Sequence, residues 1–133
     1  MNSALLESVG QKAAHHQKVI EDFFARNGQE VVAAAGAIAD VYRGDGLVGL
    51  STSGNSDNLV KAFVKAKEMG VITIGLAGMS GGEMAKVGLD HCLVVETDSI
   101  HRVQECHVII YHILWDLVHT LLADNRGSLA VSQ

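Results

Sequence analysis

Three short apolar segments, separated by stretches of helical periodicity, most constrain what this chain of 133 residues can fold into. They are residues 47–50 (LVGL), 71–76 (VITIGL) and 91–96 (HCLVVE). Short apolar runs bounded by turn-forming residues are typical of buried strands. Because helical segments alternate with these runs, the strands are expected to be parallel and covered by helices on both faces. The pattern predicts an α/β fold, a three-layer sandwich with a parallel sheet flanked by helices.

Apolar residues also recur at spacings of three and four near the N-terminus, from about residue 3 to 26 and again from 29 to 42. The intervening pair Asn27-Gly28 is typical of a helix stop, so an N-terminal helical hairpin is expected to precede the sheet. The same periodicity predicts further helices at residues 57–69, 83–87 and 99–123.

Length and composition set the broad class of protein. The length fits one domain, with the hairpin at residues 1–43 and the core at 46–124. A formal net charge of -5 argues against nucleic-acid binding, and no apolar run approaches the roughly 18 residues of a membrane span. The N-terminus lacks the pattern of a signal peptide, so a cytoplasmic protein is expected. Cys92 and Cys106 lack metal-binding spacing and are expected to be buried, reduced thiols.

A hydroxyl-rich segment, GLSTSGNSDN at residues 49–58, follows the first expected strand. It lies at the carboxyl end of that strand and opens a helix near Asp57, where free backbone N–H groups favour an anion. The segment has no Lys or Arg and no P-loop pattern, which suits a small sugar phosphate better than a nucleoside triphosphate. The alternative is a serine-rich cap and turn without a ligand. The candidate phosphate-binding residues are Ser51, Thr52, Ser53 and Ser56, with Gly54 allowing close approach.

Residues 47–95, from LVGLSTSGNS through GVITIGLAG to HCLVV, resemble the sugar isomerase (SIS) domain. Residues 101–122, HRVQECHVIIYHILWDLVHTLL, resemble the last helix of the phosphoheptose isomerase family. That helix begins Arg-(Ile/Val)-Gln-Glu and carries a His eight residues after the Gln. Here these positions are Arg102 to Glu105 and His112.

The resemblance implies an aldose–ketose isomerase that converts sedoheptulose 7-phosphate to D-glycero-D-manno-heptose 7-phosphate through an enediol. This step supplies ADP-heptose for the lipopolysaccharide core. The resemblance also implies zinc and a homotetramer, with a phosphorylated seven-carbon sugar as the ligand. It makes Gln104 a ligand to metal and substrate, and His112 a metal ligand and acid/base candidate. The hydroxyl-rich segment becomes the phosphate loop.

The residues of the last helix allow this assignment without requiring it. Gln104 and His112 lie outside the apolar stripe of the helix, about 80° apart around its axis, and could face one pocket. The alternative for His112 is a histidine packed at a helix–helix contact. His107 and His119 are expected at the surface or at an interface.

One part of the family pattern is absent. A glycine-rich GNGGSA turn and a helix with a His and a Glu, which would complete the zinc site and supply the base, should precede the STSGNS strand. The sequence runs directly from IADVYRGD into GLVGLSTSGNS, which is too short for a parallel crossover. We expect residues to be missing near Asp45-Gly46; the alternative is a genuine deletion.

Two other functions remain open. One is a non-catalytic SIS protein of the DiaA type, which binds the replication initiator. The other is a sugar-phosphate sensor. The presence of both Gln104 and His112 favours the enzyme, because a scaffold has no use for that pair.

Overall fold

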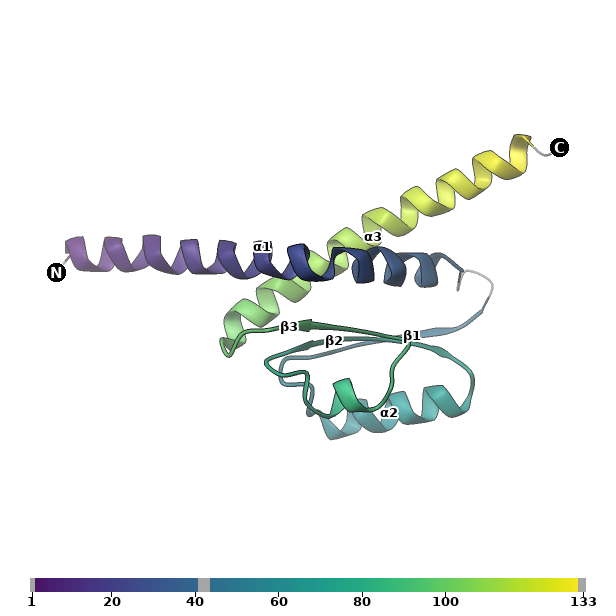
Figure 1. Cartoon of the computed structure of the whole chain (residues 1–133), viewed down its shortest axis with the longest axis horizontal. Helices are drawn as coiled ribbons and strands as arrows, with labels where there is room; N and C mark the ends of the chain where they lie inside the picture. Colours follow the sequence, from purple (N-terminus) through teal and green to yellow (C-terminus); the bar gives the residue numbers. More distant parts are fainter. Residues whose placement is uncertain (1, 41–43, 132–133) are drawn as a thin grey trace.

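A computed structural model describes residues 2–40 and 44–131, with side chains up to residue 124 (Figure 1). Three parallel strands form one sheet in the order β1-β2-β3. The elements in chain order are α1 (Asn2–Asp40), β1 (Gly46–Ser51), α2 (Asp57–Glu68), β2 (Ile72–Gly78), the 3-10 helix η2 (Gly82–Lys86), β3 (His91–Val95) and α3 (Ile100–Val131). The expected strands and parallel pairing are confirmed.

Helices cover both faces of the sheet, so the three-layer arrangement is also confirmed. Figure 1 shows α1 and α3 on one face and α2 with η2 on the other. Two apolar clusters fill the spaces between these layers. The larger one, between the sheet and α1 and α3, includes Phe23, Val31, Ile74, Leu76, Leu93, Val95, Val103, Cys106, Ile110 and Leu114. The smaller one, under α2, is built on Phe63, Ala77 and Met84.

The expected N-terminal hairpin is wrong, because α1 is one continuous helix of 39 residues. Asn27 does not end the helix; its Nδ2 donates to the carbonyl oxygen of Phe23, four residues earlier, at 3.0 Å. A glycine inside a helix costs only about 1 kcal/mol relative to alanine. Apolar residues on both sides of Gly28, including Phe23 and Val31, are buried in one core cluster that includes α3 residues. Burial of that continuous stripe outweighs the local stop signal.

Helix α3 carries the apolar stripe that the sequence predicts, with Val103, Cys106, Ile110 and Leu114 buried. Its segment Ile100–Asp124 is long and apolar enough, by length and composition, to cross a membrane. A core helix of a soluble protein has the same properties, and this stripe packs against the sheet and α1. Both cysteines are free, and burial raises the pKa of the Cys106 thiol to about 11.

Candidate functional site

The hydroxyl-rich loop lies where the sequence predicts, between the end of β1 and the start of α2. It folds around the buried side chain of Ser51, whose Oγ lies 2.8 Å from the Oγ of Ser56. The backbone N–H of Gly54 donates to the same Ser51 Oγ at 3.1 Å, and that of Asn55 donates to Ser53 Oγ at 3.2 Å. These bonds hold the serine hydroxyls in a compact loop beside the N-terminus of α2.

The loop is braced by η2 and the turn directly before it. The N–H of Met84 donates to the carbonyl of Gly54 at 3.0 Å, and the N–H of Glu83 donates to Asn55 Oδ1 at 2.9 Å. Gly54 has a φ of 74°, and a β-carbon there would overlap the carbonyl oxygen of Gly81. The sequence predicts that a glycine at position 54 lets a ligand approach the backbone closely. In the structure, glycine is needed there because a second backbone segment, at Gly81, passes close to it.

A cavity of about 280 Å³ opens between this loop and α3. Its lining residues are Leu50, Ser51, Thr52, Gln104, His107, Val108 and Tyr111. Gln104 points its Nε2 toward Thr52 Oγ1, at 3.5 Å. The structure therefore brings together three of the predicted site residues, Ser51, Thr52 and Gln104. Neither Ser53 nor Ser56 lines this cavity, although Ser56 contacts Ser51.

His107 was expected at the surface or at an interface, and the structure excludes the surface. The side chain is buried, and its Nε2 lies 2.8 Å from the carbonyl oxygen of Ala77. Because a carbonyl only accepts, Nε2 carries the proton in this contact. Burial lowers the pKa of His107, which favours the neutral imidazole, while the bond to Ala77 acts in the opposite direction. Ala77 pairs with Ser51 in the sheet, so His107 fixes α3 beside the loop.

His112 lies outside the cavity. It is exposed, and its ring packs against Tyr111 with the ring centroids 4.7 Å apart. Sequence reasoning missed both His107 and Tyr111 as cavity residues. Their spacing from Gln104, three and seven residues, places them on its face of the helix, so helical periodicity could have found them.

Gln104 and His112 by themselves do not fit a zinc ion. Protein zinc sites use three or four side-chain ligands, and this pair supplies two. Within residues 2–40 and 44–131, no group of three or more His, Cys, Asp or Glu side chains could hold a metal. A zinc site at this position needs ligands from outside the described part of one chain.

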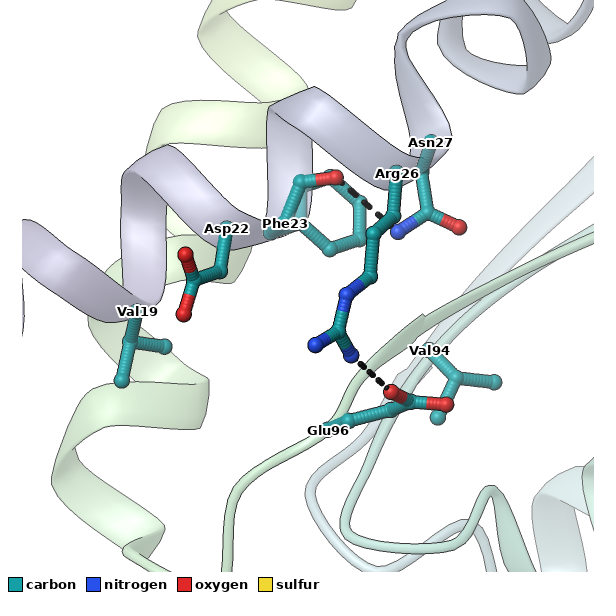
Figure 2. Close-up of a pocket in the computed structure, with 7 residues that line it drawn as sticks. All are labelled: Val19, Asp22, Phe23, Arg26, Asn27, Val94 and Glu96. Carbon is teal, nitrogen blue, oxygen red and sulfur yellow. Dashed lines mark hydrogen bonds and ion pairs between the residues drawn. The ribbon is translucent and has the colours of Figure 1, made fainter.

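Two other cavities lie away from the loop. A hollow of about 60 Å³ lies where α1 passes the end of β3. Figure 2 shows Arg26 and Glu96 pointing toward each other there, and their Nη1 and Oε2 atoms are 2.5 Å apart. Both side chains are mostly exposed, so this ion pair contributes little stability. The second cavity, about 420 Å³ between α1 and α3, contains a contact between His16 Nδ1 and Glu105 Oε2.

Comparison with protein families matches residues 9–78, more than half of the chain, to the SIS domain. The protein belongs to the SIS domain family. Its curated relatives include the phosphoheptose isomerase of Sulfurimonas denitrificans, 51% identical over 75 residues, which are 56% of this chain and 38% of that protein. The phosphoheptose isomerase of Helicobacter pylori strain Shi470 is 43% identical over 106 residues, 80% of this chain and 50% of that protein. The chain thus spans half or less of the length of these relatives.

Solved structures support the same fold. The phosphoheptose isomerase GmhA from Neisseria gonorrhoeae superposes with a TM-score of 0.78 over 87% of this chain and 99% of that chain, at 21% identity. A phosphoheptose isomerase from Francisella tularensis gives a TM-score of 0.53 at 29% identity, covering 76% of this chain and 54% of that chain.

Proposed function

We propose that this protein is an aldose–ketose isomerase of the phosphoheptose isomerase type. It converts sedoheptulose 7-phosphate to D-glycero-D-manno-heptose 7-phosphate, for ADP-heptose and lipopolysaccharide core biosynthesis. The observation that carries the proposal is Gln104 facing Thr52 across a cavity at the carboxyl end of the strands. Parallel α/β sheets bind their ligands at this edge. The two curated relatives compared above are named phosphoheptose isomerases.

In this proposal the hydroxyl-rich loop and the N-terminus of α2 bind the phosphate through neutral donors. Gln104 then contacts the hydroxyl or carbonyl oxygens of the sugar. An enediol forms when a base removes a proton from one carbon and an acid returns it to the next. His112 is the proposed acid/base group. Because it lies outside this cavity of one chain, it would act at a site shared with a second subunit. Zinc, if bound, would polarise the sugar carbonyl. The described residues contain no group of three His, Cys, Asp or Glu side chains that would hold it by themselves. The homotetramer that the family resemblance implies and the cytoplasmic location expected from the sequence are part of the same proposal.

Turnover tests the proposal directly. Purified full-length protein, with and without added zinc, is incubated with sedoheptulose 7-phosphate, and the aldose product is measured by chromatography. We expect the aldose to form in at least one condition. Absence of conversion in both conditions would refute the isomerase assignment.

A second candidate, binding without catalysis, is favoured by what the chain lacks relative to the two curated relatives compared above. The chain covers 38% and 50% of their length, and the described residues contain no metal-holding cluster of His, Cys, Asp or Glu side chains. The intact mass of the purified polypeptide separates the two cases. A mass well above 14.1 kDa means that residues are missing near Asp45-Gly46, and it supports the enzyme. A mass of 14.1 kDa means a genuine deletion, and it favours a binding protein or sensor.

Removing two loop hydroxyls is expected to weaken phosphate binding in either case. The double variant Ser53→Ala/Ser56→Ala should bind sedoheptulose 7-phosphate roughly tenfold more weakly in calorimetry, because one or two hydrogen bonds are lost. Ser3→Ala, at the far end of α1, is the matched control and should bind like the wild type. Unchanged affinity in the double variant would remove Ser53 and Ser56 from the phosphate site.

The role of His112 has its own test. His112→Ala is expected to lower turnover by at least 100-fold, the usual scale for an acid/base group, with an unchanged unfolding transition because the side chain is exposed. His119→Ala is a matched control: His119 is also exposed on α3 and packs on an aromatic ring, Trp115, at 4.4 Å. Wild-type turnover in His112→Ala would exclude His112 from the mechanism.

A further inference from the structure

The hydrogen-bonding state of His107 is fixed by its contact with the central strand. Its Nε2 lies 2.8 Å from the carbonyl oxygen of Ala77 in β2 and donates to it, because a carbonyl oxygen only accepts. A neutral imidazole carries a single N–H, so Nδ1 keeps its lone pair. Burial favours this neutral form by lowering the pKa of the ring. The bond to Ala77 therefore makes Nδ1 a hydrogen-bond acceptor.

This nitrogen reaches the loop cavity. Within residues 2–40 and 44–124, whose side chains the structure describes, the ring has one hydrogen-bond partner, Ala77. The fully buried side-chain atoms that lack a partner there are His16 Nδ1 and Arg102 Nε. Nδ1 of His107 is not one of them, so it keeps access to solvent although the residue is only 4% exposed. Since His107 lines the cavity with Gln104, that access is through the cavity.

The cavity has two chemically different walls. The loop contributes the hydroxyls of Ser51 and Thr52 close to the N-terminus of α2, a setting that suits a phosphate. Helix α3 contributes His107, Val108 and Tyr111, and none of the lining residues is Lys, Arg, Asp or Glu. A second anion at the α3 wall would face the lone pair of Nδ1 without a compensating charge. A neutral group with hydroxyl donors and C–H surfaces, such as the body of a sugar, fits that wall.

The contacts that orient His107 are made within one chain. The bond to Ala77 and the pairing of Ala77 with Ser51 both lie inside the described residues. The residues expected to be missing near Asp45-Gly46 would join the chain at the amino end of β1, whereas the cavity lies at the carboxyl end of that strand. The ring is therefore held in place without a contribution from a further segment or a second copy.

We propose that His107 is a specificity-determining residue, whose Nδ1 accepts a hydrogen bond from a hydroxyl group of the phosphorylated sugar in the loop cavity. This role rests on the sugar-phosphate ligand of the proposed function, but it does not require turnover. Gln104, three residues earlier on the same face of α3, contacts the sugar from the same side. The lone pair of Nδ1 thus favours a phosphorylated sugar over phosphate alone.

Calorimetry with two ligands tests this role. The wild type should bind sedoheptulose 7-phosphate roughly tenfold or more tightly than inorganic phosphate, because the sugar adds at least one hydrogen bond. His107→Gln keeps an amide N–H for the Ala77 carbonyl and removes the ring acceptor. It should bind inorganic phosphate like the wild type and sedoheptulose 7-phosphate about tenfold more weakly. His119→Ala, an exposed histidine of the same helix, is the matched control and should bind both ligands like the wild type.

The outcomes separate sugar recognition from a purely structural role. If His107 only holds α3 in place, His107→Gln should bind the sugar phosphate like the wild type, and that result overturns the proposal. An equal loss for both ligands overturns it too, because the effect would then lie at the phosphate. So does a wild type that binds the two ligands equally or binds neither. Selective binding that His107→Gln loses supports the role even if no aldose forms, so failure of the isomerase assignment is seen separately.

Nitrogen-15 NMR of the wild type examines the same atom and does not depend on how a variant folds. With labelled histidine, Nδ1 of His107 should show the resonance of an unprotonated ring nitrogen, and it should shift when sedoheptulose 7-phosphate donates to it. Inorganic phosphate alone should leave this resonance unchanged. A protonated Nδ1 in the free protein overturns the proposal. The absence of a shift with the sugar phosphate, as expected if a further segment of a longer chain covers the ring, also overturns it.

Discussion

Gly54→Ala is expected to lower the free energy of unfolding by about 3 kcal/mol or more and to abolish binding of a phosphorylated sugar. The left-handed backbone at Gly54, φ 74°, costs an alanine about 1–2 kcal/mol. The added β-carbon would also overlap the carbonyl oxygen of Gly81, and a clash between two backbone segments cannot be relieved by a rotamer change. Urea unfolding and calorimetry with sedoheptulose 7-phosphate measure the two effects.

Gly70→Ala is the control that separates the loss of stability caused by the clash from the loss caused by the left-handed backbone conformation. Gly70 has nearly the same φ, 72°, but a β-carbon there meets nothing within 4 Å. We expect it to cost only about 1–2 kcal/mol, the conformational part of the effect, and to leave sugar binding unchanged. Equal losses of stability in the two variants would show that the brace between the hydroxyl loop and Gly81 does not matter.

His107→Leu is expected to lower the free energy of unfolding by about 1–3 kcal/mol near pH 7.5, because the buried carbonyl of Ala77 loses its donor. It should also flatten the dependence of stability on pH. The pKa of His107 is lowered from 6.5 in the folded protein by burial, so below about pH 6.5 the unfolded chain takes up a proton that the folded protein resists. The wild type therefore loses stability as the pH falls from 7 toward 5, and the variant should lose less.

Two controls identify the cause of the pH effect. His107→Asn keeps an N–H donor without a titrating group, so it should recover part of the stability at pH 7.5 and still show the flattened profile. His119→Ala removes an exposed histidine from the same helix and should keep the wild-type slope. A wild-type slope in His107→Leu would show that another group causes the loss at low pH.

Much of the fold could be predicted because its signals are local. The expected strands at residues 71–76 and 91–96 coincide with β2 and β3 to within two residues at each end. The hydroxyl loop was predicted at the correct edge, because parallel strands bring their carboxyl ends together. The helix stop predicted at Asn27-Gly28 was wrong because this local signal is weak. Packing of α1 across the whole core, a non-local effect, outweighs it.

The sequence by itself determined the alternation of strands and helices, the apolar stripe of α3 and the hydroxyls at the end of β1. Each of these is a repeat or cluster within one segment. Only the tertiary structure decided that α1 is unbroken, that His107 rather than His112 lines the loop cavity, and that Gly54 faces Gly81. These features join residues from separate elements, such as His107 with Ala77, 30 positions apart. Helical periodicity groups His107 with Gln104 on one face of α3, but which segment that face meets depends on how whole helices and strands pack.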